Sequence, residues 1–431
     1  MSIPTQCDVV IIGSGPAGSS AATLLSQKGY EVVVLDKTSH PRRVVGESLL
    51  PHVWKFTDIL GVTKQIEQAN FIEKAGGIVQ WQGAIKRLQF KDFGHKRPAL
   101  HVEREIFDKI LCDHAKKSGG LFFERVIVRN VDFSDQKQGS VVHYQRLGEK
   151  QQAQIRCRYV IDASGPDSFL SRRLKTRQPD PDFGFTSIWG YFKGDRYLAS
   201  DGIAYPYAEI REKTPVTFVN SLGQWAWSWF IPLREQVSVG MLLPPQQLQA
   251  FNGSAEDFFL DICQNQWGLR ELLKPEQYIA GSFRQKNKYT FLADSVVGPR
   301  YYLVGDASGF VDPIYANGVV SAMYTAYLAA WSIHQSLKNP ENAFAWSQVY
   351  SSQIQGHQQI LHAVALPLDV PKSNPDTVKK GLWFQSREEK SLMFAVAAVS
   401  GRLENVHRLY PNDPDALSFM EKLKTFDTLQ L

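Results

Sequence analysis

Glycines at positions 13, 15 and 18 stand at the spacing that proteins use to hold a nucleotide phosphate. Gly13, Gly15 and Gly18 follow an apolar stretch, and small residues that suit a helix come next. Such a run allows a tight turn and lets a pyrophosphate approach the helix N-terminus. Asp36 ends the following apolar stretch, where a carboxylate accepts hydrogen bonds from a ribose. The spacing predicts a bound dinucleotide, and it does not by itself separate FAD from NAD.

A second set of residues, later in the chain, narrows the choice of nucleotide. Gly305 and Asp306 follow an apolar stretch and precede Asp312, Pro313 and Gly318. This order resembles the second FAD fingerprint of the para-hydroxybenzoate-hydroxylase-like flavoproteins, and the resemblance implies that Asp306 binds the ribityl chain. A helix that begins just after Gly318 would point its positive end at the flavin edge that becomes negative on reduction. The expected cofactor is therefore FAD.

Two further segments resemble parts of such flavoproteins that touch the cofactor. Residues 46–51 read G-E-S-L-L-P and resemble a step of the flavin-dependent halogenases, which implies cofactor contacts for Glu47 and Ser48. The same step occurs in geranylgeranyl-reductase-like proteins, and a helix cap or a loop salt bridge would also explain Glu47. Arg104 resembles the arginine beside the FAD phosphates or ribose; an exposed arginine at a helix start is the alternative.

Lys74 is the residue that we expect to carry halogen chemistry. It opens the pattern K-x-G-x-x-x-x-W, which ends at Trp81 and resembles a segment of halogenases that act on phenol-type and carrier-bound substrates. In that chemistry a lysine receives hypohalous acid, by hydrogen bond or as a haloamine, and presents the halogen to a ring. Lysine suits this task because burial lowers its pKa and its stem is long. A solvated surface charge is the alternative.

Residues 227–232, with the sequence W-S-W-F-I-P, resemble the W-x-W-x-I-P signature of the flavin-dependent halogenase family. Trp227 and Trp229 alternate at the period of a strand, so both indoles lie on one face of a sheet. In the family the tryptophans are thought to seal the passage between flavin and substrate, while core packing is the alternative. The resemblance covers roughly residues 5–340.

Asn317 departs from the family pattern. The family usually shows a Ser/Thr-Gly step after D-P-x-x, where backbone amides beside the flavin bind halide. Here the run is D-P-I-Y-A-N-G, over residues 312–318. Backbone amides need no particular side chain, so halide binding stays compatible with the sequence, but Asn317 adds a polar amide beside the flavin. This residue therefore favours an alternative in which oxygen is transferred without halide.

The elements that would position these residues indicate the fold class. Residues 8–12 and 31–36 predict strands on either side of a helix from residue 17 to 28, which is one βαβ unit. A helical stretch is expected from about residue 50 to 68. We expect an α/β fold with a Rossmann-like FAD-binding domain interleaved with a mixed β-sheet substrate domain, and a helical C-terminal part. The expected ranges are 1–70, 101–182 and 283–340 for FAD binding, 71–100 and 183–282 for the sheet domain, and 341–431 for the helical region.

Composition excludes several other classes of function. The formal net charge of the 431 residues is only +5, spread without a polybasic block, so we expect no nucleic-acid partner. The four cysteines show no C-x-x-C spacing, which argues against a metal site or a disulfide framework. No stretch reaches the ~18 apolar residues of a membrane helix. We expect a cytoplasmic protein without a membrane partner.

The resemblance implies an enzyme that uses reduced FAD and O2 to form a flavin hydroperoxide and halogenate an electron-rich aromatic ring. A separate flavin reductase is the expected partner, because the sequence shows no second nucleotide fingerprint. The aromatic substrate is free, or bound to a carrier or partner protein. Three alternatives stay open: a monooxygenase that hydroxylates an aromatic ring, for example a protein tryptophan during quinone-cofactor maturation; a prenyl reductase; and a non-catalytic flavin-binding accessory protein.

Overall fold

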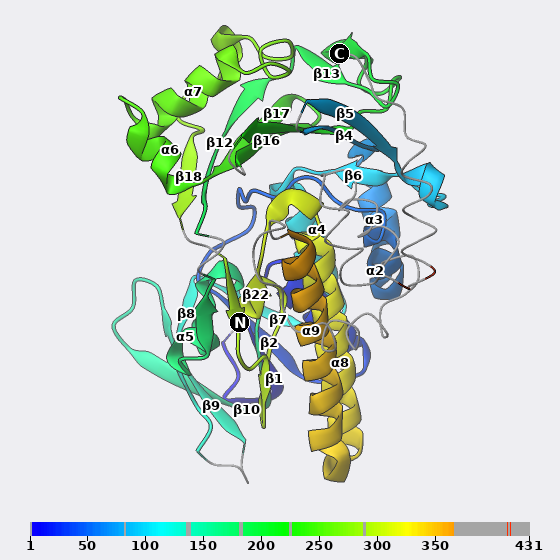
Figure 1. Ribbon diagram of the computed structural model, residues 1–431. Helices are drawn as coiled ribbons and strands as arrows, with labels where there is room; N and C mark the ends of the chain where they lie inside the picture. Colours follow the sequence, from blue (N-terminus) through cyan, green and yellow to red (C-terminus); the bar gives the residue numbers. More distant parts are fainter. Residues whose placement is uncertain are drawn as a thin grey trace.

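The computed structural model describes residues 2–365 except 82, 135–138, 181–183, 224–225 and 288–289, together with residues 412 and 414. Most of the helical region expected over residues 341–431 therefore lies outside the described residues, as does Trp225. Two sheets dominate the described part of the chain, one below the other in Figure 1.

The first sheet is built around parallel strands, in the order β20-β21-β10-β1-β2-β7, and β9 and β8 extend it from β10. β1 pairs in parallel with both β2 and β10, and its residues Val9, Val10 and Ile11 are fully buried. Continuous apolar strands of this kind are typical of a parallel sheet that is covered on both faces. The strands are β1 (Gln6–Ile12), β2 (Val32–Asp36), β7 (Leu121–Glu124), β8 (Val126–Asp132), β9 (Ser140–Arg146), β10 (Gln152–Asp162), β20 (Val297–Gly298) and β21 (Tyr301–Leu303).

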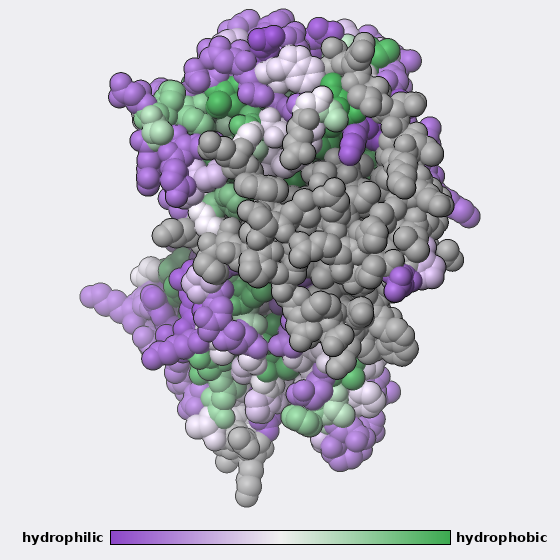
Figure 2. All heavy atoms as spheres, viewed as in Figure 1, coloured by the Kyte–Doolittle hydropathy of each residue, from purple (hydrophilic) through white to green (hydrophobic). Residues whose placement is uncertain are grey.

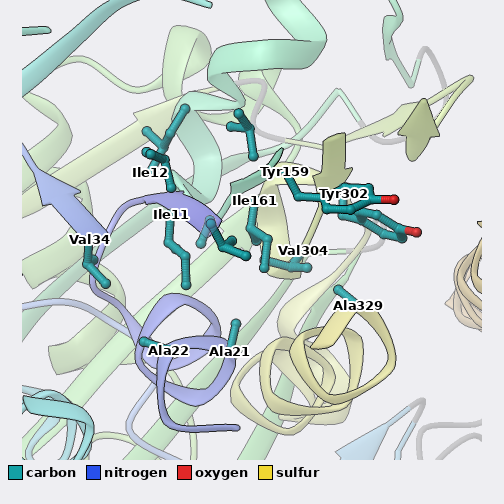
Figure 3. Packing of buried hydrophobic residues seen from close by; sticks show 14 of the residues in the cluster. Ile11, Ile12, Ala21, Ala22, Val34, Tyr159, Ile161, Tyr302, Val304 and Ala329 are labelled. Atoms are coloured by element: carbon teal, nitrogen blue, oxygen red, sulfur yellow. The ribbon is translucent and has the colours of Figure 1, made fainter. Parts of the chain in front are cut away.

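Helices α1 (Pro16–Gln27) and α8 (Gly318–Lys338) pack side by side against this sheet. Figure 3 shows how small residues make the contact close: Ala21 and Ala22 of α1 and Ala329 of α8 face Ile11 and Val304. Helix α4 (Arg104–Lys117) packs against α1, and α9 (Ala343–Ala365) packs along α8. The glycine turn between β1 and α1 thus lies in a closely packed part of the core.

The second sheet is a mixed one, in the order β18-β12-β17-β16-β15-β4-β5. Neighbouring strands are antiparallel except for the parallel pair β15 and β4. The strands are β4 (Gly76–Trp81), β5 (Ala84–Gln89), β12 (Thr186–Lys193), β15 (Thr217–Gly223), β16 (Ala226–Pro232), β17 (Gln236–Leu243) and β18 (Arg284–Asn287). Because β18 belongs here, this sheet extends to residue 287. Helices α6 (Pro245–Ala250) and α7 (Ala255–Asn265) lie over its outer side, where Figure 2 shows a mostly hydrophilic surface.

Short elements connect the two sheets. The strands β3 (Ile72–Lys74) and β6 (Ala99–His101) pair antiparallel, and the turn η1 (Phe90–Phe93) lies between them in the chain. The remaining short elements are α5 (Phe169–Arg173), β11 (Arg177–Pro179), β13 (Arg196–Leu198), β14 (Ala204–Pro206), β19 (Phe291–Ala293), β22 (Gly309–Phe310), and the turns η2 (Gly165–Asp167), η3 (Tyr207–Glu209), η4 (Pro275–Gln277), η5 (Gly305–Ala307), η6 (Pro313–Tyr315) and η7 (Pro340–Asn342).

The helical stretch expected over residues 50–68 is divided into two parts. The structure has two helices there, α2 (Val53–Leu60) and α3 (Thr63–Gln68). Gly61 ends α2 in the left-handed conformation, with φ of 77°, which glycine adopts without the strain that a side chain would cause. None of the described helices is both long enough and apolar enough to cross a membrane.

Candidate functional site

A cavity of about 780 Å³ extends from the turn between β1 and α1 to the inner face of the second sheet. It is lined by residues that the sequence analysis placed in separate motifs. The predicted site residues among them are Gly13, Gly15, Asp36, Glu47, Ser48, Arg104, Trp227, Trp229, Asp306 and Gly318. Gly18, Lys74 and Asn317 are predicted site residues that do not appear among the described lining residues.

The three glycines of the first motif have different roles in the structure. A Cβ atom on Gly13 would lie 2.4 Å from the carbonyl oxygen of Ala163, and one on Gly18 would lie 2.0 Å from the carbonyl oxygen of Gly13. These two glycines therefore let backbone segments approach one another. A Cβ atom on Gly15 would meet only the Arg42 guanidinium, at 3.4 Å. Gly15 is thus the glycine whose missing side chain leaves space for a ligand at the start of α1.

Asp36 lies at the end of β2 and is held in place by Ser14, Thr38 and Arg42. Its carboxylate accepts hydrogen bonds from the amide and hydroxyl groups of Ser14 and Thr38, at 2.6–2.7 Å, and pairs with Arg42 at 2.9 Å. Burial alone would raise the pKa of the Asp36 carboxyl, but Arg42 and these hydrogen bonds hold that pKa below its ordinary value. The residue therefore presents a negative charge to the cavity.

Arg104 and Glu47 lie close to each other on the cavity wall. Both carboxylate oxygens of Asp108, one turn later on α4, accept hydrogen bonds from Arg104, at 2.8 and 3.0 Å. Arg104 also donates to the Gly46 carbonyl at 3.3 Å. The Glu47 carboxylate accepts a hydrogen bond from the Tyr191 hydroxyl at 2.6 Å, and burial raises its pKa. The loop that carries Glu47 is thus joined to helix α4 and to strand β12 of the second sheet.

Asp306 and the N-terminus of α8 form a further part of the wall. Burial raises the pKa of Asp306, while the charges of Lys286 and Arg104 act in the opposite direction. Helix α8 begins at Gly318, directly after Asn317. The Asn317 side-chain nitrogen is buried and has no hydrogen-bond partner among the described residues. This amide could therefore donate to a ligand near the helix N-terminus.

Trp227 and Trp229 lie on β16 and face the cavity from the second sheet. Only 2% and 6% of their surfaces are exposed, and the ring centroids are 5.8 Å apart. The Trp229 indole lies over Gly240 of the neighbouring strand, where a Cβ atom would be 2.1 Å from the ring. Both residues belong to the same hydrophobic cluster as Val319 at the start of α8, so they are core residues and cavity residues at once.

Lys74 is the most unusual charged side chain near the cavity. It is only 4% exposed, and its Nζ donates to the Ser48 hydroxyl at 2.8 Å and to the Leu49 carbonyl at 3.1 Å. Burial lowers the pKa of Lys74 to about 7. Because Ser48 lines the cavity, the Lys74 nitrogen lies one hydrogen bond behind the cavity surface. The surface charge considered as an alternative is therefore wrong for this lysine.

The residues around the cavity fit FAD. An open approach above Gly15, with the Arg42 guanidinium beside it, suits an anionic pyrophosphate at the N-terminus of α1. Asp36 would accept hydrogen bonds from ribose hydroxyl groups beside this turn, and Asp306 and the N-terminus of α8 line the same cavity. These donors and acceptors suit the pyrophosphate, the ribose and the ribityl chain of FAD.

Comparison with known proteins identifies the family. The sequence model described as "FAD binding domain" matches residues 6–343. A 1H-pyrrole-2-carbonyl-[peptidyl-carrier protein] chlorinase of Pseudomonas fluorescens is 32% identical over 77% of this chain and 76% of its own length. The chain belongs to the flavin-dependent halogenase family. A second family member, a tryptophan 2-halogenase of Chondromyces crocatus, is 29% identical, and the match spans 83% of this chain but only 66% of that protein.

Solved structures agree in fold. The flavin-dependent halogenase CmlS has a TM-score of 0.74 at 24% identity, over 98% of this chain and 78% of that one. The myxobacterial chondrochloren halogenase CndH has a TM-score of 0.72 at 24% identity, over 97% of both chains. The expected halogenase-like family, the α/β fold class with C-terminal helices and the FAD cofactor are thereby confirmed.

The sequence analysis missed several residues that line or support this cavity. Arg42 pairs with Asp36, and the spacing of Asp108 four residues after Arg104 could have indicated their ion pair. Tyr191, Thr217 and His101 carried no local signal. Tyr191 meets Glu47 and Thr217 meets His101 across 144 and 116 residues of sequence, so only the fold brings these residues together.

Proposed function

We propose that the protein halogenates an electron-rich aromatic or pyrrole-type ring, with FAD reduced by a separate flavin reductase. The observation that carries this proposal is the buried amine of Lys74, which has a pKa of about 7 and lies directly behind a cavity-lining hydroxyl. An amine that is neutral near pH 7 has a lone pair for an electrophilic halogen, whereas an ordinary lysine is almost fully protonated. Bound FAD supplies the activation of O2 from which hypohalous acid is made.

The other site residues would bind and separate the reactants. Gly15, Asp36 and Arg104 would hold the pyrophosphate and the adenosine side of FAD, and Asp306 the ribityl chain. For the halogen to reach Lys74, the lysine nitrogen must leave its hydrogen bond with Ser48 while it attacks the halogen and must form that bond again afterwards. Trp227 and Trp229 would stand between the flavin and the substrate, so that the ring meets the halogen at the lysine.

The chemistry of the cavity favours an aromatic substrate. Its second-sheet side carries three indoles, those of Trp189, Trp227 and Trp229, and aromatic faces pack well against an aromatic ring. The relatives include a tryptophan halogenase and a chlorinase whose pyrrole is held by a carrier protein. We propose that the substrate is an aromatic ring of this kind, either free or attached to a carrier or partner protein.

A second candidate function is aromatic hydroxylation without halide, for example of a tryptophan in a partner protein. Asn317 favours it, because its side-chain nitrogen has no partner among the described residues and is a donor that suits an oxygen-bearing group beside the flavin. Lys74 opposes it, since oxygen delivered straight to a ring needs no amine relay.

The experiment that separates the candidates is mass spectrometry of products formed with and without bromide. The protein is supplied with FAD, NADH, a flavin reductase and O2, and is offered an indole, a phenol and a carrier-bound pyrrole. A product with the bromine isotope pair supports halogenation, and one that gains only oxygen establishes the hydroxylase. A reduced double bond in a prenyl substrate would indicate a prenyl reductase, and no product from any substrate would indicate an accessory protein.

Lys74→Met provides the matched control for this experiment. The methionine keeps an unbranched side chain but lacks the amine, so bromination should fall by orders of magnitude, while FAD affinity and O2 consumption change little. Bromination by Lys74→Met at the wild-type rate would refute the role of the lysine.

A further inference from the structure

A line of four buried side chains leads from Lys74 on β3, through Ser48 and Thr217, to His101 on β6. The Lys74 nitrogen lies 2.8 Å from the Ser48 oxygen, the Ser48 oxygen lies 2.9 Å from the Thr217 oxygen, and the Thr217 oxygen lies 2.9 Å from Nε2 of His101. All four residues are less than a tenth exposed, and His101 is fully buried. The line is continuous at hydrogen-bond distance from an amine to an imidazole.

Strand pairing, not loop conformation, sets this line. Lys74 and His101 lie on the paired strands β3 and β6, where His101 is opposite Ile72. Ser48 forms an isolated backbone bridge to His101. Thr217 begins β15, and this strand pairs with β4, which begins two residues after Lys74. The two hydroxyl groups each donate and accept, so the same four atoms can be bonded in either direction.

The surroundings favour one shared proton over two charges. Lys74 meets the Ser48 hydroxyl, the Leu49 carbonyl and the Phe90 ring, and burial is the cause of its lowered pKa. The pKa of His101 lies well below its ordinary value through burial and then through the charge of Lys74, and the nearby Pro232 carbonyl opposes this decrease. Two positive charges so close together in an apolar region repel one another strongly.

We infer that Ser48, Thr217 and His101 form a proton relay that takes a proton from Lys74 and returns it during halogen transfer. This inference rests on the proposed function and deepens it. The three relay residues act through Lys74, which alone among the four would form a bond to the halogen. Their geometry fits this role because each hydroxyl passes on one proton as it receives another.

Proton transfer along the relay precedes and follows the attack on the halogen. One proton leaves the Lys74 ammonium for Ser48, Ser48 gives its own proton to Thr217, and Thr217 gives its own to Nε2 of His101. The neutral amine attacks the halogen of hypohalous acid, so that a nitrogen–halogen bond forms, the halogen–oxygen bond breaks, and the hydroxide leaves as water with one amine proton. The relay then runs in reverse and protonates the haloamine. Transfer of the halogen to the ring releases a neutral amine, which takes up the proton that the ring loses.

Thr217→Val and Thr217→Ser test the relay. Valine keeps the shape of threonine and removes the hydroxyl, whereas serine keeps the hydroxyl, so only Thr217→Val interrupts the line. Bromination rates are measured from pH 6 to 9 on the FAD-loaded protein with a flavin reductase. His101→Gln is the second variant, because glutamine can bond to Thr217 but does not take up the proton.

Two further measurements do not depend on turnover. Competitive labelling of amines with acetic anhydride, followed by mass spectrometry of the peptide that contains Lys74, gives the apparent pKa of that amine in each variant. Absorbance of the bound flavin shows that each variant is folded and loaded.

The relay predicts a loss that depends on pH. Thr217→Val and His101→Gln should brominate tens of times more slowly than wild type at pH 6, where the ammonium must first lose its proton, and the defect should shrink by pH 9. The bromination rate of Thr217→Ser should stay within about threefold of the wild-type rate. The pKa of Lys74 measured by competitive labelling should not change in any of the variants. If the wild type brominates, either of two results overturns the relay. One is a loss of rate that is the same at every pH, and the other is a loss that is the same in Thr217→Val and Thr217→Ser. A wild-type enzyme that forms no brominated product overturns the proposed function and the relay together.

Discussion

Lys74 and Asp36 show how burial acts on single charged residues. Both are less than a tenth exposed, but Asp36 has Arg42 and four hydrogen-bond donations around its carboxylate, whereas Lys74 has two neutral acceptors. The pKa of Asp36 therefore falls in spite of burial, and the pKa of Lys74 falls because of it. Asp36 keeps its charge, and Lys74 gives its charge up near neutral pH.

The lowered pKa of Lys74 means that this residue decreases the free energy of unfolding at pH 7. The unfolded lysine titrates near 10.5 and the folded one near 7, so between these values the unfolded chain binds more protons and wild-type stability rises with pH. Lys74→Met carries no such charge. The variant should therefore be more stable than wild type at pH 7, and its advantage should shrink toward pH 10, as measured by urea unfolding at both values. Lys91→Met, at an exposed position, is the control, and an advantage that is equal at both values would contradict the prediction.

Asp36→Ala should weaken FAD binding. A hydrogen bond to a charged group contributes about 1.5–3 kcal/mol, so the dissociation constant should rise by roughly ten- to a hundredfold. Flavin fluorescence titration of the apoprotein measures this change. Asp261→Ala, on the exposed side of α7, is the matched control. Equal affinities for FAD in the two variants would show that Asp36 does not contribute to cofactor binding.

At the scale of elements, the pairing of β16 with β17 determines where Trp229 lies. Trp229 is opposite Gly240 in the register of these strands, and the indole covers the space that a side chain on Gly240 would fill. Because Gly240 has no side chain, the Trp229 indole can lie flat against the sheet at the cavity wall.

Gly240→Ala should push this indole toward the cavity. The added methyl group would lie 2.1 Å from the ring, and overpacking of a core typically costs about 1–3 kcal/mol. We expect a lower melting temperature, a changed tryptophan fluorescence and slower halogenation. Gly77→Ala, whose added methyl would make an ordinary contact at 3.5 Å, is the control for glycine removal in the same sheet. Unchanged fluorescence and stability in Gly240→Ala would show that the ring moves freely.

The elements also show what the sequence could and could not reveal. The βαβ unit and the alternation of Trp227 and Trp229 follow from local period, so they could be predicted. Gly61 interrupts a helical pattern only through its left-handed φ of 77°, which apolar periodicity does not contain. The bond between Thr217 and His101 depends on two strand pairings and spans 116 residues, so no local rule predicts it.

At the scale of the molecule, one hydrophobic cluster joins the second sheet to helices that cover the first sheet. It contains Trp229 of the second sheet, Phe107 of α4 and Val319 of α8, and the cavity lies within the same region. We expect the described layers to unfold in a single transition, with tryptophan fluorescence and far-ultraviolet circular dichroism coincident. FAD at about 100 times its dissociation constant should stabilise the protein by about 2.7 kcal/mol. Two separate transitions, only one of which shifts with FAD, would contradict a shared core.

Helix α9 sets a practical limit on how short this protein can be made. The family match ends at residue 343, where α9 begins, so a shortened version that stops there would look complete by sequence. Yet the Tyr350 hydroxyl of α9 donates to the Leu303 carbonyl, and the Gln358 side chain donates to the Ser308 hydroxyl at 3.0 Å. These contacts hold the segment on either side of Asp306. Trimming the chain at the end of the match would uncover the strand that leads to Asp306, so truncation for crystallisation or protein engineering should begin beyond residue 365.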